Sequence, residues 1–139
     1  MNFISTRNTA PAATLSQAIA AGLAPDGGLY VPDVLPAPRE LAAGDDIAST
    51  AATLLAPFFA GDALEGELAA ICREAFDFPA PLRPLGMPDD HVLELFHGPT
   101  AAFKDFGARL LAASMARVRR NERAPLTILV ATSGDTGAA

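Results

Sequence analysis

The chain has 139 residues, of which 10 are lysine or arginine and 16 are aspartate or glutamate, so its formal net charge is −6. This excess of acidic residues argues against binding to nucleic acid, which requires a basic surface. Half of the residues are hydrophobic and 19% are charged, a balance that supports a buried core and differs from that of disordered chains. The composition therefore indicates a globular chain of one or two domains.

One cysteine, Cys72, is present, so no intrachain disulfide can form. No histidine lies near it in the sequence, and we expect it to be a buried apolar residue rather than a nucleophile. The N-terminal stretch has neither the pattern of a secretory signal nor that of an organelle-targeting peptide, and no run of about 18 or more apolar residues occurs. These features predict a cytoplasmic protein that does not enter a membrane.

Residues 1–88 are predicted to form a mostly helical region. Apolar residues between positions 15 and 19 follow a helical spacing after Thr14, and Gly22 can end that helix. Residues 23–32 predict a turn that leads into a short extended segment.

A second stretch of this region, residues 47–76, has apolar residues at helical spacing with a break near Gly61. This pattern predicts two amphipathic helices. The charged residues of the stretch are expected to form a solvated face: Glu65, Glu67, Arg73 and Glu74.

From residue 89 onward the pattern changes to that of a parallel α/β domain. Residues 91–96 are a short apolar run of strand length, and residues 126–131 are a second run that is rich in β-branched residues. Apolar residues between Phe103 and Val118 follow a helical spacing. The order strand, helix, strand predicts one βαβ unit with a right-handed crossover. The predicted fold class is α/β: a helical N-terminal region, followed over residues 89–139 by the first βαβ unit of a parallel-sheet domain.

Four arginines fall in or just after the last turns of the predicted helix: Arg117, Arg119, Arg120 and Arg123. Cations suit the negative end of a helix dipole, and we favour this structural interpretation. A phosphate-binding patch is the alternative.

Lys104 is the only lysine in the chain, because the other nine basic residues are arginines. A lysine amine can lose its proton and form an imine, which arginine cannot do, so this single lysine suggests covalent or acid–base chemistry. Thr100 is predicted to cap the following helix, which places Lys104 in its first turn, where the helix dipole favours a neutral amine. The alternative is an exposed lysine whose stem covers Phe103 or Phe106.

A cluster of small residues follows the second predicted strand: Thr132, Ser133, Gly134, Asp135, Thr136 and Gly137. Hydroxyl groups and glycines that open a helix at the carboxyl end of a strand form a nest of backbone N–H groups for an anion. Ligands of α/β sheets bind at this edge. The alternative is an ordinary strand-to-helix turn that Ser133 or Asp135 caps. His97 is a further candidate for contact with a phosphate group, or simply a turn residue.

Three segments of the chain carry a resemblance to a known family. The segment HGPTAAFKDFG at residues 97–107 closely resembles the pyridoxal-phosphate lysine motif of threonine synthases. The segments ISTR at residues 4–7 and GLAPDGGLYVP at residues 22–32 are similar to the opening of that family, and SGDTG at residues 133–137 is similar to its substrate loop. The segments stand in the order that the family has, and they extend from one end of the chain to the other.

The resemblance implies an enzyme of the tryptophan-synthase-β fold type that uses pyridoxal 5′-phosphate. It would convert O-phospho-L-homoserine and water to L-threonine and phosphate, the last step of threonine biosynthesis. Lys104 would hold the cofactor as a Schiff base and shuttle protons at Cα and Cβ. Phe103 would form a wall beside the cofactor, Asp135 would lie near its 3′-oxygen, and Asp105 would be a charge at the helix N-terminus. The substrate carboxylate would be bound by Ser133, Gly134 and Thr136. No metal site is expected.

The chain departs from this family in its length. Threonine synthases are several times longer, and the glycine-rich loop for the cofactor phosphate and the polar partner of the pyridine nitrogen have no counterpart in these 139 residues. The resemblance therefore implies an N-terminal part that is inactive alone and whose partner is the missing C-terminal part of its own chain. Two alternatives remain: another pyridoxal-phosphate lyase or dehydratase of the same fold type, and a non-catalytic module that resembles threonine synthase.

Overall fold

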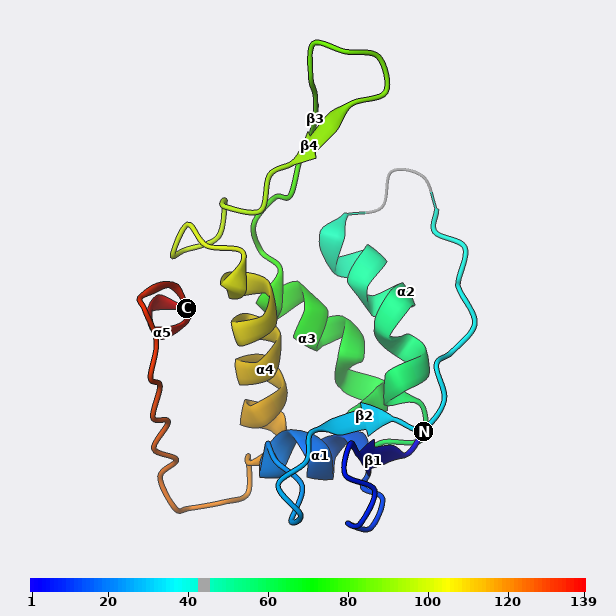
Figure 1. Ribbon diagram of the computed structural model, residues 1–139, viewed down its shortest axis with the longest axis vertical. Coiled ribbons are helices and arrows are strands. Elements are labelled where there is room, and N and C mark those ends of the chain that lie inside the picture. Colours follow the sequence, from blue (N-terminus) through cyan, green and yellow to red (C-terminus); the bar gives the residue numbers. More distant parts are fainter. Residues whose placement is uncertain (43–45) are drawn as a thin grey trace.

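The structure is a computed structural model and describes residues 1–42 and 46–139 (Figure 1). Its elements in chain order are β1 (Phe3–Ser5), α1 (Leu15–Ala21), β2 (Tyr30–Pro32), α2 (Ile47–Phe59), a 3-10 turn (Glu65–Glu67), α3 (Leu68–Ala75), β3 (Leu82–Pro84), β4 (His91–Leu93), α4 (Lys104–Val118) and α5 (Asp135–Ala138). Figure 1 shows α2, α3 and α4 side by side, with α1 and the β1–β2 pair across one end of them. The described part of residues 1–88 contains α1, α2 and α3 as well as three short strands, and α4 extends the layer that α2 and α3 form.

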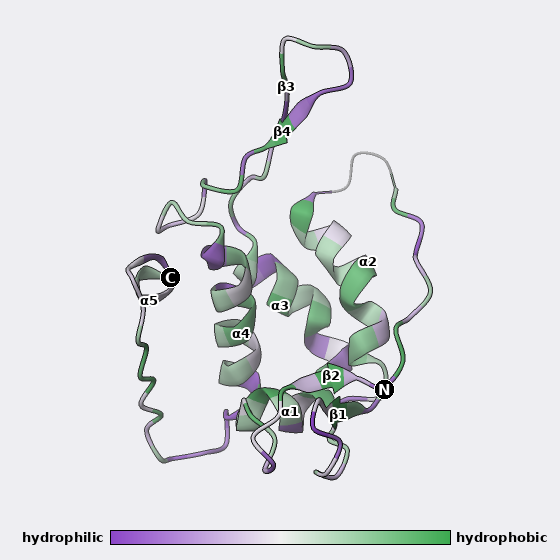
Figure 2. Ribbon diagram, in the orientation of Figure 1, coloured by the Kyte–Doolittle hydropathy of each residue, from purple (hydrophilic) through white to green (hydrophobic). Residues whose placement is uncertain are grey.

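The main core lies between α2, α3 and α4. It is formed by seven buried residues: Ala48, Phe59, Leu64, Leu68, Ile71, Cys72 and Ala113. Figure 2 shows that hydrophobic residues predominate along these three helices. Ile71 and Cys72 have no exposed surface, so the sequence-based prediction that Cys72 is buried is confirmed. Burial raises the pKa of the Cys72 thiol, which keeps the unreactive protonated form.

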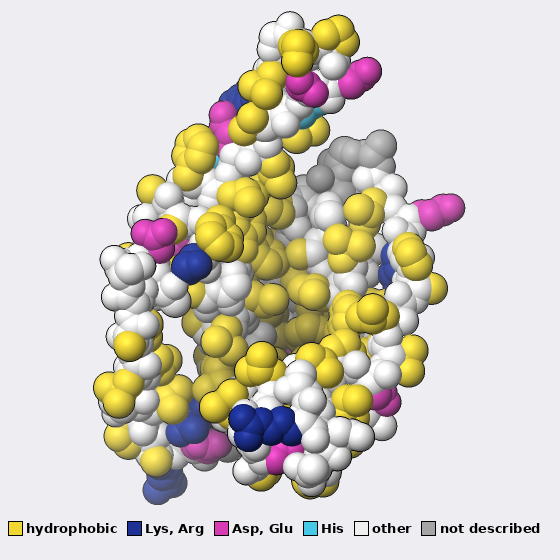
Figure 3. Space-filling view, in the orientation of Figure 1, with side chains coloured by type: hydrophobic (Ala, Val, Ile, Leu, Met, Phe, Trp, Pro, Cys, Tyr) yellow, Lys and Arg dark blue, Asp and Glu magenta, His cyan; other side chains and the backbone are white. Residues whose placement is uncertain are grey.

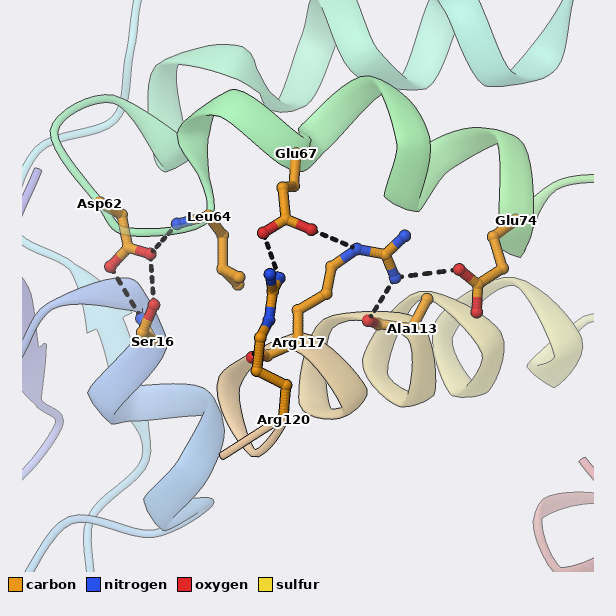
Figure 4. Close-up of polar contacts among 8 residues, drawn as sticks. All are labelled: Ser16, Asp62, Leu64, Glu67, Glu74, Ala113, Arg117 and Arg120. Atoms are coloured by element: carbon orange, nitrogen blue, oxygen red, sulfur yellow. Dashed lines mark hydrogen bonds and ion pairs between the residues drawn. The ribbon is translucent and has the colours of Figure 1, made fainter. Parts of the chain in front are cut away.

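Side-chain caps define the start of α1, and a further pair of hydrogen bonds holds it against the turn between α2 and α3. The Thr14 hydroxyl accepts from the Gln17 N–H, and the Gln17 side chain accepts from the Thr14 N–H, which makes a complete capping box. Asp62 accepts from the backbone N–H and the hydroxyl of Ser16, as Figure 4 shows. Gly22 follows α1 with a φ of +71°, which confirms the predicted end of this helix.

Charged side chains join α3 to α4 (Figure 4). Arg117 donates to Glu67 at 3.1 Å and to Glu74 at 2.9 Å, and Arg120 also pairs with Glu67. The prediction of a solvated face is confirmed for Glu65, Arg73 and Glu74, which are exposed. Glu67 is half-buried, because α4 brings Arg117 and Arg120 to it, and the spacing within one helix does not show which charges a second helix contributes. For Arg117 and Arg120 the structural interpretation is confirmed.

The strands differ in pairing from the predicted βαβ unit. β4 pairs with β3 as an antiparallel hairpin, with Arg83 opposite Val92, and this hairpin projects away from the helices (Figure 1). Residues 126–131 are extended but form no strand, and Leu129 is 91% exposed. The physical reason is that the local partner, residues 82–84, closes a short loop, whereas a parallel strand requires neighbouring strands and cover on both faces.

No helix among the described residues has both the length and the apolar character needed to cross a membrane.

Candidate functional site

Lys104 is the first residue of α4, directly after Phe103. Its side chain is half-buried, and its Nζ atom lies 4.4 Å from the centre of the Phe103 ring. The Phe103 residue is itself 59% exposed. Among the residues that the structure describes, no carboxylate forms an ion pair with the Lys104 amine. The site thus presents an amine without a carboxylate partner beside an accessible aromatic face.

The turn before α4 is organised differently from its prediction. Thr100 does not cap the helix: its N–H donates to Asp105 Oδ2 at 3.0 Å and its hydroxyl donates to Asp105 Oδ1 at 2.8 Å. The helix begins only at Lys104, because the residues between form turns in which Ala101 has a φ of +56°. The predicted position of Lys104 in the first helical turn is nevertheless confirmed. Asp105 is a charged residue near the helix N-terminus, as expected, and it is only 1% exposed.

The loop of residues 132–137 lies at the end of an extended segment that returns alongside α4 (Figure 1). The predicted helix opening is present, since α5 begins at Asp135. Gly134 has a φ of +142°, a conformation that glycine adopts readily, and its N–H donates to Thr132 Oγ1 at 3.3 Å. Ser133 and Thr136 are exposed. In Figure 1, α5 lies beside the first turns of α4, so the two motifs that the sequence singled out approach the same end of that helix.

The surface around α4 is apolar. Phe96 is 55% exposed and Leu111 is 52% exposed, and both are close to Phe103 in the sequence. Figure 3 shows hydrophobic side chains gathered over the middle of this face of the molecule, between α4 and α2.

The opening motifs of the chain have a structural role that sequence reasoning missed. The Asp26 carboxylate accepts hydrogen bonds from the Ser5 hydroxyl at 2.6 Å, from the N–H and hydroxyl of Thr9, and from the N–H groups of Ala10 and Gly28. These bonds hold the pKa of the Asp26 carboxyl far below its ordinary value, the largest contribution being that of Ser5. The glycines after Asp26 were the signal in the sequence. In the structure Gly28 must be glycine, because a Cβ atom at this position would overlap the Ser5 hydroxyl that binds Asp26.

Comparison with known proteins identifies the family. The family model described as "Threonine synthase N terminus" matches residues 2–76, more than half of the chain. This chain belongs to the threonine synthase family. The threonine synthase of Pseudomonas aeruginosa is 44% identical over all of this chain, and that of Escherichia coli K12 is 39% identical over 91% of it.

Solved threonine synthase structures are similar as well. The crystal structure of the Escherichia coli enzyme matches 99% of this chain with a TM-score of 0.83 and 35% identity. The structure of the Brucella melitensis threonine synthase with pyridoxal phosphate bound matches 86% of this chain with a TM-score of 0.75 and 38% identity. These similarities confirm the predicted α/β fold class. The chain spans about a third of the length of its curated threonine synthase relatives, namely 31% of the Pseudomonas aeruginosa protein.

His97 is held by its own neighbours in the chain. Its Nε2 atom lies 2.7 Å from Glu94 Oε2, and its ring stacks on Phe96 with the ring centres 4.7 Å apart. Glu94 also lies 3.7 Å from the Arg83 side chain on β3. His97 is therefore a turn residue that links β4 to the lysine motif, and its contact with a phosphate group remains a prediction.

Proposed function

We propose that this chain supplies the cofactor lysine and the substrate-binding loop of a threonine synthase, which converts O-phospho-L-homoserine and water to L-threonine and phosphate. The observation that carries the proposal is the environment of Lys104. The only lysine of the chain opens α4 without a carboxylate partner among the described residues, next to an exposed aromatic ring.

These residues fit pyridoxal 5′-phosphate. An aldehyde cofactor with a planar ring requires an accessible primary amine and a flat apolar surface, and Lys104 and Phe103 provide both. A carboxylate bonded to the amine would hold it as an ammonium ion and compete with covalent attachment, and none of the described residues does so. The Brucella melitensis relative binds this cofactor, which supports the assignment.

When bound, the cofactor supplies an electron sink for charge that develops on the substrate. Lys104 would hold the cofactor covalently and would move protons at Cα and Cβ of the substrate. Its place at the start of α4, beside the exposed Phe103 ring, supports this role. Phe103 orients the cofactor ring and excludes water from one face of it.

The loop at the start of α5 binds the substrate. Ser133 and Thr136 donate their hydroxyl groups to the substrate carboxylate, and Gly134 donates its backbone N–H. Asp135 would lie near the 3′-oxygen of the cofactor. The position of α5 beside the first turns of α4 supports this arrangement, since it brings the loop toward the end of the helix that carries Lys104.

The 139 residues alone are expected to show no threonine synthase activity, either in the cytoplasm or as the purified chain. Residues 1–88 form the helical region, and residues 89–139 open the cofactor domain. The partner that completes the site is a C-terminal part of the same chain, in line with relatives that are about three times as long. Without that part the Lys104 amine and the Ser133 loop are not held in register, and correct positioning can supply about 7–11 kcal/mol of barrier lowering.

The proposal is tested by a chimera in which residues 1–139 replace the corresponding third of the Pseudomonas aeruginosa threonine synthase. We expect the chimera to release phosphate from O-phosphohomoserine and to form threonine, and the Lys104→Ala chimera to fold but form none. Arg39→Ala, which removes an exposed cation elsewhere, is the matched control and should keep the activity.

Two results would count against the proposal. A folded chimera that forms no threonine would favour a non-catalytic module. Full activity of the Lys104→Ala chimera would show that another amine carries the chemistry.

A further inference from the structure

The turn that precedes Lys104 contains a buried carboxylate. Asp105 is 1% exposed, although it is adjacent in sequence to the half-buried Lys104. Both of its oxygens accept hydrogen bonds from Thr100, one from the backbone N–H at 3.0 Å and one from the hydroxyl at 2.8 Å. A carboxylate is costly to bury unless it is hydrogen-bonded, so these two bonds account for its place in the interior.

Gly98 encloses the same carboxylate from the other side. A Cβ atom added at Gly98 would lie 2.7 Å from Asp105 Cβ and 2.8 Å from Asp105 Cγ, which no side chain can occupy without a shift of the backbone. The Gly98 carbonyl also accepts from the Ala101 N–H at 3.1 Å. Residues 98–105 are therefore closed on the Asp105 side chain into one compact turn.

The pattern of these bonds differs from an ordinary helix cap. A capping carboxylate accepts from N–H groups in the first turn of its own helix. Asp105 accepts instead from Thr100, which lies outside α4. Its carboxylate thus ties the preceding turn to the helix rather than completing the helix itself.

This tie fixes the direction of Lys104. Consecutive residues of an α-helix project about 100° apart, so a helix start held with Asp105 inward keeps Lys104 directed away from the interior. In the structure, that direction places the Lys104 amine over the Phe103 ring.

We propose that Asp105 is the positioning residue of Lys104: its buried carboxylate, bonded to Thr100 and packed on Gly98, sets the direction in which the Lys104 amine projects. The inference rests on the proposed function for its catalytic meaning, because Lys104 is the amine that binds the cofactor. The direction of Lys104 is itself a property of the chain that can be measured without any cofactor.

The single lysine makes the experiment direct, because the chain labelled with ¹³Cε-lysine gives one lysine NMR signal. The Phe103 ring shifts this signal, and Phe103→Leu defines how much. We expect Asp105→Ala to abolish the shift, and Asp105→Asn to retain most of it, since an amide can still accept from the Thr100 N–H and donate to the Thr100 hydroxyl. Asp33→Ala, which removes an exposed carboxylate, is the matched control and should change nothing.

The second readout is the reactivity of the amine. The chain has two primary amines, Lys104 and the N-terminus of Met1. Treatment with pyridoxal phosphate and borohydride followed by peptide mapping gives the ratio of adduct on the two. Misplacement of a reacting group by about 1 Å can cost up to about 100-fold in rate, and we expect Asp105→Ala to lower the share of Lys104 about tenfold while Asp105→Asn restores it.

Because Asp105→Ala can unfold the turn, Thr100→Ala serves as the second variant. It removes the hydroxyl and leaves the backbone donor, and it should lose part of the NMR shift in a chain whose remaining spectrum is unchanged. An unchanged lysine signal in folded Asp105→Ala or Thr100→Ala would overturn the inference, and so would an Asp105→Asn chain that behaves like Asp105→Ala. If the NMR result holds but the cofactor-loaded chimera carries no adduct on Lys104, the proposed function fails while the positioning role stands.

Discussion

Arg117 is a polar link between α4 and α3, and its replacement by methionine tests how much this link stabilises the fold. Its side chain is 17% exposed and donates to Glu67, to Glu74 and to the Ala113 carbonyl at 2.8 Å (Figure 4). Methionine keeps most of the apolar stem and removes all three polar contacts.

The size of the effect follows from the exposure of the partners. Glu67 is 36% exposed and Glu74 is 56% exposed, so water screens both ion pairs, and each is expected to contribute about 0.5–1 kcal/mol. With the bond to the Ala113 carbonyl, the free energy of unfolding should fall by about 1.5–2.5 kcal/mol. The loss should be smaller at high salt, because salt screens the two ion pairs and not the bond to the carbonyl.

The assay is urea unfolding of the chain, followed by circular dichroism. Arg123→Met is the matched control, because Arg123 is an exposed arginine of the same region, and it should change the free energy of unfolding by no more than about 0.5 kcal/mol. A double-mutant cycle with Glu74→Gln should give a coupling energy of about 0.5–1 kcal/mol. Equal stability of Arg117→Met and Arg123→Met, or no coupling to Glu74, would refute this account of how α4 is held.

Three further outcomes are expected. The pKa of the Asp26 carboxyl is lowered in the folded chain, so its hydrogen bonds stabilise the fold at pH values above its ordinary pKa of 3.8. This stabilisation is lost as the pH falls from 3.8 toward the lower pKa of the folded chain. A plot of stability against acid pH should therefore be flatter for Asp26→Asn than for the control Asp33→Asn, and parallel curves would contradict this. In the chimera, Ser133→Ala or Thr136→Ala should weaken substrate binding by about 1.5–3 kcal/mol and leave cofactor binding unchanged, because each removes a hydrogen bond to a charged group. Loss of cofactor with normal substrate binding would instead assign the loop to the cofactor phosphate. Gly98→Ala should destabilise the turn before α4, and hydrogen exchange of residues 98–105 no faster than in the unmodified chain would show that the turn accommodates a Cβ atom.

The sequence predicted the elements that depend on local patterns. The helix that Thr14 starts and Gly22 ends and the break between α2 and α3 follow from spacing and capping rules that act within a few residues.

The features that the sequence did not predict depend on distant partners. Arg117 and Glu67 are 50 residues apart, and Ser5 and Asp26 are 21 residues apart, so no local rule pairs them. Residues 126–131 have the composition of a buried parallel strand, but such a strand forms only beside neighbouring strands. Thr100 was assigned to the helix cap because hydroxyl residues are common there, whereas its hydrogen bonds go to Asp105.

The central claim is that Lys104 is the residue that binds pyridoxal phosphate. Borohydride reduction of the cofactor-loaded chimera, followed by peptide mapping, measures this directly, because the covalent adduct marks one residue. The pyridoxyl group is expected on Lys104, and it should be absent from that peptide in the Lys104→Ala chimera. An adduct on a lysine of the Pseudomonas aeruginosa portion, with Lys104 unmodified, would contradict this claim.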